Sequence, residues 1–317
     1  MPAVTMETVG PYDCLYISPH RDDAALACAG KILSERSRDL SVLVVTLFEN
    51  PGEGRGAEAV HERLEADCVE AGIPHARRRD PSDGSYRSLA HRRLPEDERA
   101  LVQATRLLAE LGPRTRARHV YAPLGVGGHI DHRLAHEAAL RAFGSEAGRN
   151  LFFYEEWPEA FAPGAVRVRL GLLGARLPPA AVNAPERAGL VRYLLRLCLA
   201  PALRGELAGW SDRFRAAAPA IGQWRLTRAW NPQRALGPRL QPVIHVAGPE
   251  SAAAIVDVAG ALLPGRSRAR TAERFRSLAS AYAAKLGGGP YAERYWLLLP
   301  SLDGAEEAAL APAVGQE

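Results

Sequence analysis

Ionisable side chains crowd into one short segment near the start of the chain. His20, Asp22 and Asp23 follow an apolar run that ends at Pro19. The residue before a proline avoids the helical conformation, so we expect a strand to end there. An apolar segment of helical length begins at Ala24. The three side chains therefore lie at the C-terminal end of a predicted strand, where open α/β sheets bind their ligands.

A second polar cluster follows a glycine-rich turn much further along the chain. His129 and His132 come after a strand-like run over residues 119–124, and in the helical pattern that follows they share one face. Two such junctions in one parallel sheet can meet at a single crevice. We therefore predict that His20, Asp23 and His132 supply three ligands to one metal ion.

The predicted ligands favour hydrolytic chemistry. Two imidazoles and one carboxylate suit zinc with a fourth position open to water, and the same donors also suit non-haem Fe(II). Asp22 lies beside a ligand, where it can act as general base toward water at the metal. His129 is then available to stabilise or protonate a tetrahedral oxyanion, with Asp131 fixing its tautomer.

Together the two clusters resemble the signature motifs of the PIG-L/LmbE family, and they read Pro19-His20-Arg21-Asp22-Asp23 and His129-Ile130-Asp131-His132. That family comprises zinc-dependent de-N-acetylases of N-acetylglucosaminyl-phosphatidylinositol, of mycothiol and bacillithiol precursors and of antibiotic sugars. The resemblance, which covers about residues 12–157, implies that zinc is the metal and that Asp22 is the base. It also implies that His129, oriented by Asp131, assists at the oxyanion or the leaving amine.

Further side chains are predicted to contact the substrate. A segment from Asp83 to Arg87 is similar to one near the substrate mouth of bacterial members, and residues 153–156 resemble a family strand that ends in acidic residues. The family usually has an uncharged residue at position 21. Arg21 either lowers the pKa of the neighbouring base, points outward or contacts an acidic substrate group. The predicted substrate contacts are Arg21, Arg55, Asp83, Arg87 and Glu155.

The composition narrows the class of protein. The net charge is +4, and almost all of the basic residues are arginines. The arginine clusters have no interleaved aromatic residues, which predicts no nucleic-acid partner. The 4 cysteines lack metal or redox spacing and favour a reducing compartment. No secretory signal is recognisable at the N-terminus, and the apolar stretch over 190–203 is interrupted by charge and by Pro201, which predicts no membrane span. We expect a cytoplasmic protein; the sequence carries no signal of its oligomeric state.

Strand and helix patterns alternate through the first half of the chain. Continuous apolar strands between helices predict an α/β fold, with a Rossmann-like and mostly parallel sheet sandwiched by helices. Residues 1–160 are predicted to form the catalytic domain with the metal site. Residues 161–317 are predicted to form a mainly helical extension that packs on the core and shapes the pocket. The expected strands are 13–18, 41–48, 75–79, 119–124, 151–156 and 242–246, and the expected helices are 24–37, 57–71, 95–111, 130–143, 186–200, 204–218, 250–263 and 270–285.

These expectations define one leading function and its rivals. The leading hypothesis is a zinc-dependent hydrolase that removes the acetyl group from an N-acetylated amino sugar of the N-acetylglucosaminyl type, free or in a glycoconjugate. One alternative is a metal-dependent amidase on a non-sugar or thiol-conjugate substrate, since substrate chemistry transfers poorly within a fold. Another is a non-catalytic binding protein on the same scaffold. An Fe(II) oxygenase is disfavoured because its ligand triad normally lies on a β-barrel.

Overall fold

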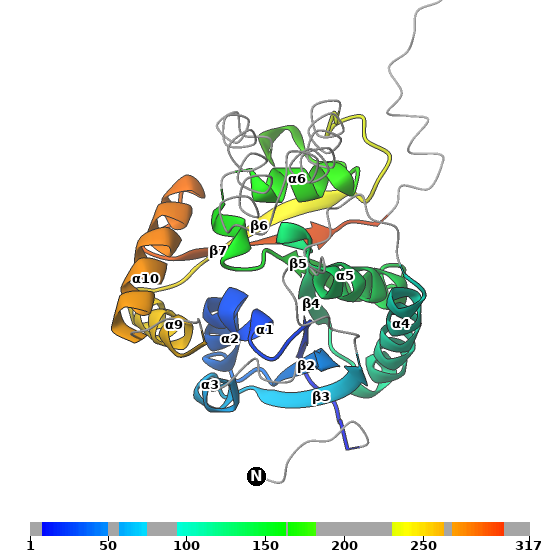
Figure 1. Cartoon of the computed structure of the whole chain (residues 1–317), viewed down its shortest axis with the longest axis horizontal. Coiled ribbons are helices and arrows are strands. Elements are labelled where there is room, and N and C mark those ends of the chain that lie inside the picture. Colours follow the sequence, from blue (N-terminus) through cyan, green and yellow to red (C-terminus); the bar gives the residue numbers. More distant parts are fainter. Residues whose placement is uncertain are drawn as a thin grey trace, which may run out of the picture.

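A seven-stranded sheet forms the centre of the molecule, with helices on both faces (Figure 1). The computed structural model describes residues 8–49, 57–74, 94–162, 164–181, 230–262 and 268–300. The strand order is β3-β2-β1-β4-β5-β7-β6. The strands are β1 Cys14–Ser18, β2 Val42–Glu49, β3 Asp67–Pro74, β4 His119–Pro123, β5 Asn150–Tyr154, β6 Leu240–Val246 and β7 Ala292–Leu298. Strands β1 to β5 run parallel, whereas β7 pairs antiparallel with both β5 and β6.

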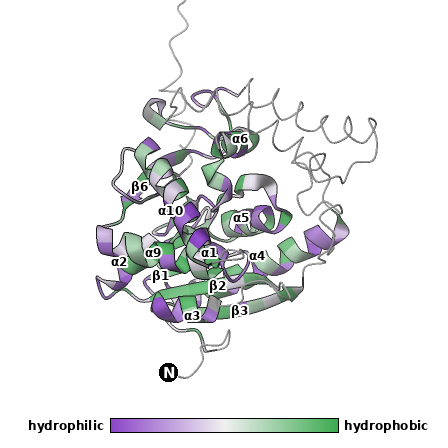
Figure 2. Cartoon of the chain, turned by 60° about the vertical axis from the view of Figure 1, so that its left-hand side comes forward, coloured by the Kyte–Doolittle hydropathy of each residue, from purple (hydrophilic) through white to green (hydrophobic). Residues whose placement is uncertain are grey.

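Two groups of helices enclose the sheet. Helices α1 (Asp23–Ala27), α2 (Ala29–Arg36), α3 (Ala57–Arg63), α9 (Pro249–Leu262) and α10 (Arg268–Lys285) gather on one side. Helices α4 (Pro95–Thr115) and α5 (Ile130–Phe143) pack together on the other, and α6 (Ala165–Leu172) follows β5. Strand β2 is hydrophobic along most of its length, as expected of a strand buried on both faces (Figure 2). The predicted α/β class and the helical C-terminal region are confirmed.

The third strand differs from its prediction. We expected a helix over 57–71, but α3 ends at Arg63 and β3 begins at Asp67, with Glu65 in the left-handed conformation between them (φ 51°). Val69 and Ile73 are buried in β3, which pairs with β2. Pairing with β2 therefore outweighs the helical preference of this stretch. The strand expected over 75–79 lies outside the described residues.

The C-terminal part contributes more strand than the sequence indicates. Strand β7 was not predicted, yet it lies between β5 and β6 and buries Tyr295 and Trp296. Its Glu293 accepts hydrogen bonds from the backbone N–H groups of Gly30 (2.7 Å) and Lys31 (3.0 Å) in the first turn of α2. Helices α9 and α10 confirm two predicted helices, while those expected over 186–200 and 204–218 lie outside the described residues. The division into residues 1–160 and 161–317 stays a prediction.

Candidate metal centre

The turn after β1 carries the first cluster. The predicted helix over 24–37 is two helices, and α1 begins at Asp23 with Asp22 as its N-cap residue. The Ser18 hydroxyl donates to the carbonyl of His20 and accepts from the N–H of Ala24 at 3.0 Å. The backbone carbonyl of Asp22 accepts from the N–H of Leu26 at 2.8 Å, and the Asp22 side chain is half-buried. These bonds fix the turn that presents the histidine and both aspartates.

The second cluster follows β4 through a tight glycine turn. Gly125, Gly127 and Gly128 have φ of 87°, 82° and 85°, a region that other residues rarely adopt. A 3₁₀ turn, η2 (Val126–Gly128), leads to His129, which is the N-cap residue of α5. The turn thereby delivers two histidines to the edge of the sheet where β1 also ends.

This turn predicts a measurable cost for one methyl group. A Cβ on Gly127 would lie 2.6 Å from Cγ of Glu159, so we expect Gly127→Ala to destabilise the protein by about 2–5 kcal/mol. Gly148 has the same φ of 82° with nothing within 4 Å of a Cβ, so Gly148→Ala should cost only about 1–2 kcal/mol. Chemical denaturation measures both. Equal costs would show that the contact with Glu159 adds nothing to the backbone strain.

The structure brings His20, Asp23 and His132 close together. Oδ2 of Asp23 lies 3.2 Å from Nδ1 of His20 and 3.2 Å from Nε2 of His132. The three donor atoms all lie within 4.8 Å of one another, and the side chains of both histidines are buried. This compact set of two imidazoles and a carboxylate can hold one metal ion.

Two more carboxylates contact the outer ring nitrogens of the histidines. Oδ2 of Asp131 lies 2.8 Å from Nε2 of His20, and Oε1 of Glu156 lies 3.3 Å from Nδ1 of His132. Carboxylates in such positions fix the tautomer and orientation of metal-binding imidazoles. Each histidine therefore presents its remaining nitrogen to Asp23.

Asp131 is arranged differently from the expected contact with His129. Its carboxylate is 2.8 Å from His20 but 3.9 Å from Nδ1 of His129. Its backbone N–H donates to Nδ1 of His129 at 3.3 Å. That bond leaves the ring proton of His129 on Nε2, so the main chain of Asp131 fixes this tautomer while its side chain contacts His20. Asp131 with His20 and His129 forms a second set of possible metal-binding side chains.

The electrostatics of the cluster favour a cation. Burial lowers the pKa of His20, but the carboxylates of Asp23 and Asp131 outweigh it and raise the pKa to about 9. Burial likewise lowers the pKa of His132, while Asp23 and Glu156 hold it well above its usual value. Burial and the charge of His132 lower the pKa of His129 to about 3, which keeps that ring neutral. The buried carboxylates thus attract positive charge to the point where the predicted ligands meet, and a divalent ion fits this donor set.

Arg21 extends from the same turn toward α3 and β3. Its guanidinium lies 2.6 Å from Oε2 of Glu70 and 3.8 Å from Oε1 of Glu58, and its side chain is half-exposed. Its backbone carbonyl accepts from Nε2 of His61 at 2.9 Å. Of the three roles considered for Arg21, this geometry supports the outward one.

We expect Arg21→Ala to have little effect on catalysis. A half-exposed ion pair contributes at most about 1 kcal/mol to stability, and Glu70→Gln should reproduce that loss. Because the guanidinium is engaged by Glu70, we expect kcat and KM to change less than about threefold. Steady-state kinetics decide this: a rise in KM of tenfold or more in Arg21→Ala, absent from Glu70→Gln, would place Arg21 at the substrate.

The other predicted substrate contacts are distributed differently. Arg55, Asp83 and Arg87 lie outside the described residues. Glu155 is buried, and it accepts hydrogen bonds from three side chains of α10 and β7, namely Tyr282, Arg294 at 2.6 Å and Trp296 at 2.8 Å. These bonds join the end of β5 to the C-terminal part of the chain.

Sequence reasoning missed Glu156. This carboxylate is buried. It accepts from the N–H groups of Gly125 at 2.5 Å and Val126 at 3.0 Å, and it lies 3.3 Å from Nδ1 of His132. The available signal was the pair of adjacent acidic residues after a buried strand. That pair pointed to the strand end without showing which member faces the glycine turn.

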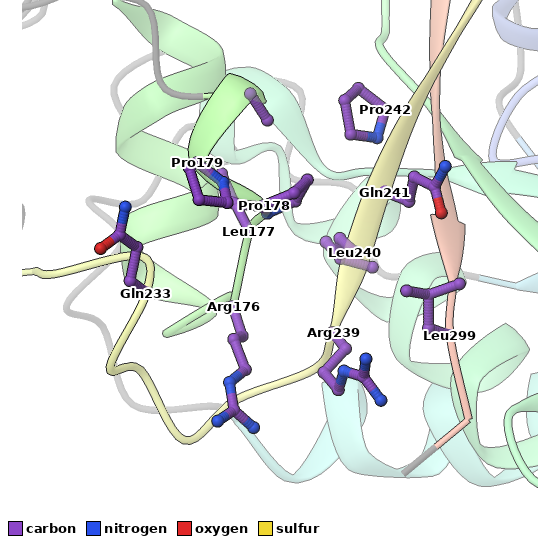
Figure 3. A pocket seen from close by; sticks show the side chains of 11 residues that line it. Arg176, Leu177, Pro178, Pro179, Gln233, Arg239, Leu240, Gln241, Pro242 and Leu299 are labelled. Atoms are coloured by element: carbon purple, nitrogen blue, oxygen red, sulfur yellow. The ribbon is translucent and has the colours of Figure 1, made fainter. Parts of the chain in front are cut away.

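A pocket elsewhere on the molecule contains none of the predicted site residues. It has a volume of about 700 Å³ and lies between the Arg176–Pro179 segment and β6, with Leu240 and Pro242 on its wall (Figure 3).

None of the helices in the described part of the chain combines the length and apolar character that a membrane span requires.

Comparisons with known proteins agree with the motifs. Residues 15–143, which contain both clusters, match the family model described as PIG-L: GlcNAc-PI de-N-acetylase. The 2'-N-acetylparomamine deacetylase of Streptomyces fradiae is 29% identical over 252 residues, which are 69% of this chain and 89% of that protein.

Solved structures share the fold. The zinc-inhibited form of teicoplanin deacetylase Orf2 superposes with a TM-score of 0.54 at 18% identity, over 92% of this chain and 99% of that one. A deacetylase–teicoplanin complex gives a TM-score of 0.53 at 16% identity over the same shares. The likeness therefore extends through the C-terminal half, beyond the region that matches the family model.

Proposed function

We propose, from the match of residues 15–143 to the PIG-L family model, that the chain is a zinc-dependent hydrolase that removes the acetyl group from an N-acetylated amino sugar. The observation that carries the proposal is the convergence of His20, Asp23 and His132 within one 4.8 Å cluster at the ends of two parallel strands. The family description names a de-N-acetylase, and the Streptomyces fradiae relative acts on an acetylated amino sugar. An N-acetylglucosaminyl-type sugar or glycoconjugate is therefore the proposed substrate.

The proposed metal is zinc, held by His20, Asp23 and His132. Two imidazoles and one carboxylate leave a position open, as in catalytic zinc sites. When bound, the ion polarises the amide carbonyl and lowers the pKa of water. Asp131 and Glu156 orient the two imidazoles from outside.

The remaining side chains divide the proton transfers among them. Asp22 takes a proton from water as the water oxygen bonds to the amide carbon. His129 donates from Nε2 to the oxyanion that forms, since its Nδ1 is already occupied by the backbone N–H of Asp131. Asp22 then delivers its proton to the nitrogen, the carbon–nitrogen bond breaks, and the free amine and acetic acid leave; the acid ionises to acetate in solution.

Three finer points complete the proposal. We place the metal site within a catalytic domain of residues 1–160, with residues 161–317 shaping the pocket and completing the sheet through β6 and β7. Arg55, Asp83 and Arg87 remain the candidates for substrate contacts, whereas Arg21 is engaged by Glu70 and Glu155 by Arg294 and Trp296. A cytoplasmic location is supported by the free thiols of Cys14, Cys28 and Cys68, which suit a reducing compartment.

Acetate release tests the function. The full chain, loaded with zinc, is incubated with N-acetylglucosamine derivatives and with 2'-N-acetylparomamine, and we expect acetate from at least one of them together with about one metal ion per chain. Hydrolysis of a thiol-conjugate or other non-sugar amide alone would instead identify the alternative amidase. A protein with no affinity for zinc and no hydrolysis would be a binding protein on the same scaffold.

A further inference from the structure

Glu156 connects two parts of the site that are separate in the sequence. Its Oε1 accepts from the N–H of Gly125 and lies 3.3 Å from Nδ1 of His132, and its Oε2 accepts from the N–H of Val126. The residue is 1% exposed, so its carboxylate is isolated from bulk water. A single buried side chain thus contacts both the glycine turn and a predicted metal ligand.

The backbone geometry provides a pocket for this carboxylate. Consecutive N–H groups of a turn with a left-handed residue form an anion-binding concavity, and Gly125 supplies the left-handed conformation here. Nε of Arg169 donates to the carbonyl of Leu124 at 2.7 Å, immediately before this turn. The main chain therefore fixes the position of the carboxylate independently of its contact with His132.

The contact with His132 has a defined direction. Nε2 of this ring faces Asp23 at 3.2 Å, and the opposite nitrogen, Nδ1, faces Glu156. A proton held on Nδ1 by the carboxylate leaves the lone pair of Nε2 available to a metal ion. The same carboxylate holds the turn that leads into His129, the predicted oxyanion donor.

We propose that Glu156 is a positioning residue that holds the predicted metal ligand His132 and the turn before His129 in one fixed arrangement, through its 3.3 Å charge contact with Nδ1 of His132 and its hydrogen bonds from the N–H groups of Gly125 and Val126. The inference rests on the proposed function only in taking His132 as a metal ligand. Glu156 is enclosed by protein, and in this role it acts through the two histidine-bearing elements.

The neighbouring residue offers a matched control. Glu155 is also buried at the end of β5, but its carboxylate accepts from Arg294 and Trp296 of β7. Glu155→Gln therefore removes a buried charge of the same kind, one residue away, from a network on another part of the fold. A purely structural role for Glu156 would make the two variants behave alike.

The experiment measures metal binding in the full chain. Zinc dissociation constants are determined by competition with a chromophoric chelator, and the visible spectrum of the cobalt-loaded protein reports the ligand geometry. We expect Glu156→Gln to raise the zinc Kd about 10- to 100-fold and to change the cobalt spectrum, as loss of such outer carboxylates does. Glu155→Gln should change the zinc Kd by less than about threefold and leave the spectrum intact, whatever its effect on thermal unfolding.

Further results would separate this role of Glu156 from its alternatives. Equal changes in Kd for the two variants, in proportion to their loss of stability, would overturn it. If Glu156→Gln does not fold, nitrogen NMR of the zinc-loaded wild type decides, since His132 must be metallated at Nε2 with its proton on Nδ1, and coordination through Nδ1 would overturn the assignment. Suppose that the wild type binds zinc, that Glu156→Gln weakens this binding as expected, and that the wild type releases no acetate: the proposed function would then be refuted and the role of Glu156 would stand. A wild type that binds no zinc would refute both.

Discussion

Asp22→Asn is expected to lower kcat by about 10²- to 10⁴-fold, or roughly 3–5 kcal/mol in activation free energy, while the protein keeps its metal. The reason is that an amide cannot accept a proton from water at neutral pH. Asp22 lies between two residues of the cluster and is the N-cap residue of α1, where its side chain makes no capping bond, so asparagine preserves its size and breaks no capping bond. Metal analysis and steady-state kinetics on the same preparation measure the two effects.

Asp23→Asn provides the contrasting variant. Oδ2 of Asp23 faces both histidines, so this change should cost metal affinity as well as activity. The pH profile adds a second criterion, because loss of the base removes the acidic limb of kcat/KM in Asp22→Asn. Full activity of Asp22→Asn on an N-acetyl substrate would show that another group is the base.

Removal of the metal is expected to have the second large effect. Chelation should abolish hydrolysis and destabilise the fold, and zinc at a free concentration of about 1,000 times its Kd should restore about 4 kcal/mol in the free energy of unfolding. His132→Gln should lose this zinc-dependent gain. Denaturation with and without zinc measures the gain directly.

A neighbouring histidine controls for general damage to α5. His136 is buried one turn beyond His132, with Nδ1 bonded to the carbonyl of Pro123 at 3.0 Å. His136→Gln should lower stability equally with and without zinc and keep the zinc-dependent gain.

The affinity of the protein for zinc should also rise with pH toward about 9, because zinc must displace the proton that the nearby carboxylates stabilise on His20. A gain that persists in His132→Gln would place the ion elsewhere.

The candidate site could be predicted from the sequence because each of its two clusters lies within a short segment. The apolar run that ends at Pro19 and the glycines before His129 each mark a strand end, and parallel strands bring such ends to one edge. Strand β1 pairs with β4 in parallel, and this pairing places the two clusters side by side. The confirmed α/β fold follows from the same alternation of buried strands and helices.

The missed features depend on distant pairing. We expected residues 67–71 to complete a helix, and their pairing with β2 makes them part of a strand instead. Strand β7 is similar, because Trp296 pairs with Phe153 from a remote part of the chain. The role of Glu156 requires the folded glycine turn, so no spacing rule could distinguish it from Glu155.

Glu155 and Glu156 also bear on how this enzyme could be recombined with its relatives. The carboxylate of Glu155 is satisfied by donors from the C-terminal strand, and that of Glu156 accepts from the glycine turn and contacts the predicted metal ligand His132. A hybrid that joins residues 1–160 to a foreign C-terminal half would leave Glu155 buried without its donors unless that half supplied them. Because an uncompensated buried charge costs several kcal/mol, the strand end would shift and carry Glu156 with it. Successful exchange of C-terminal halves should therefore require equivalents of Arg294 and Trp296.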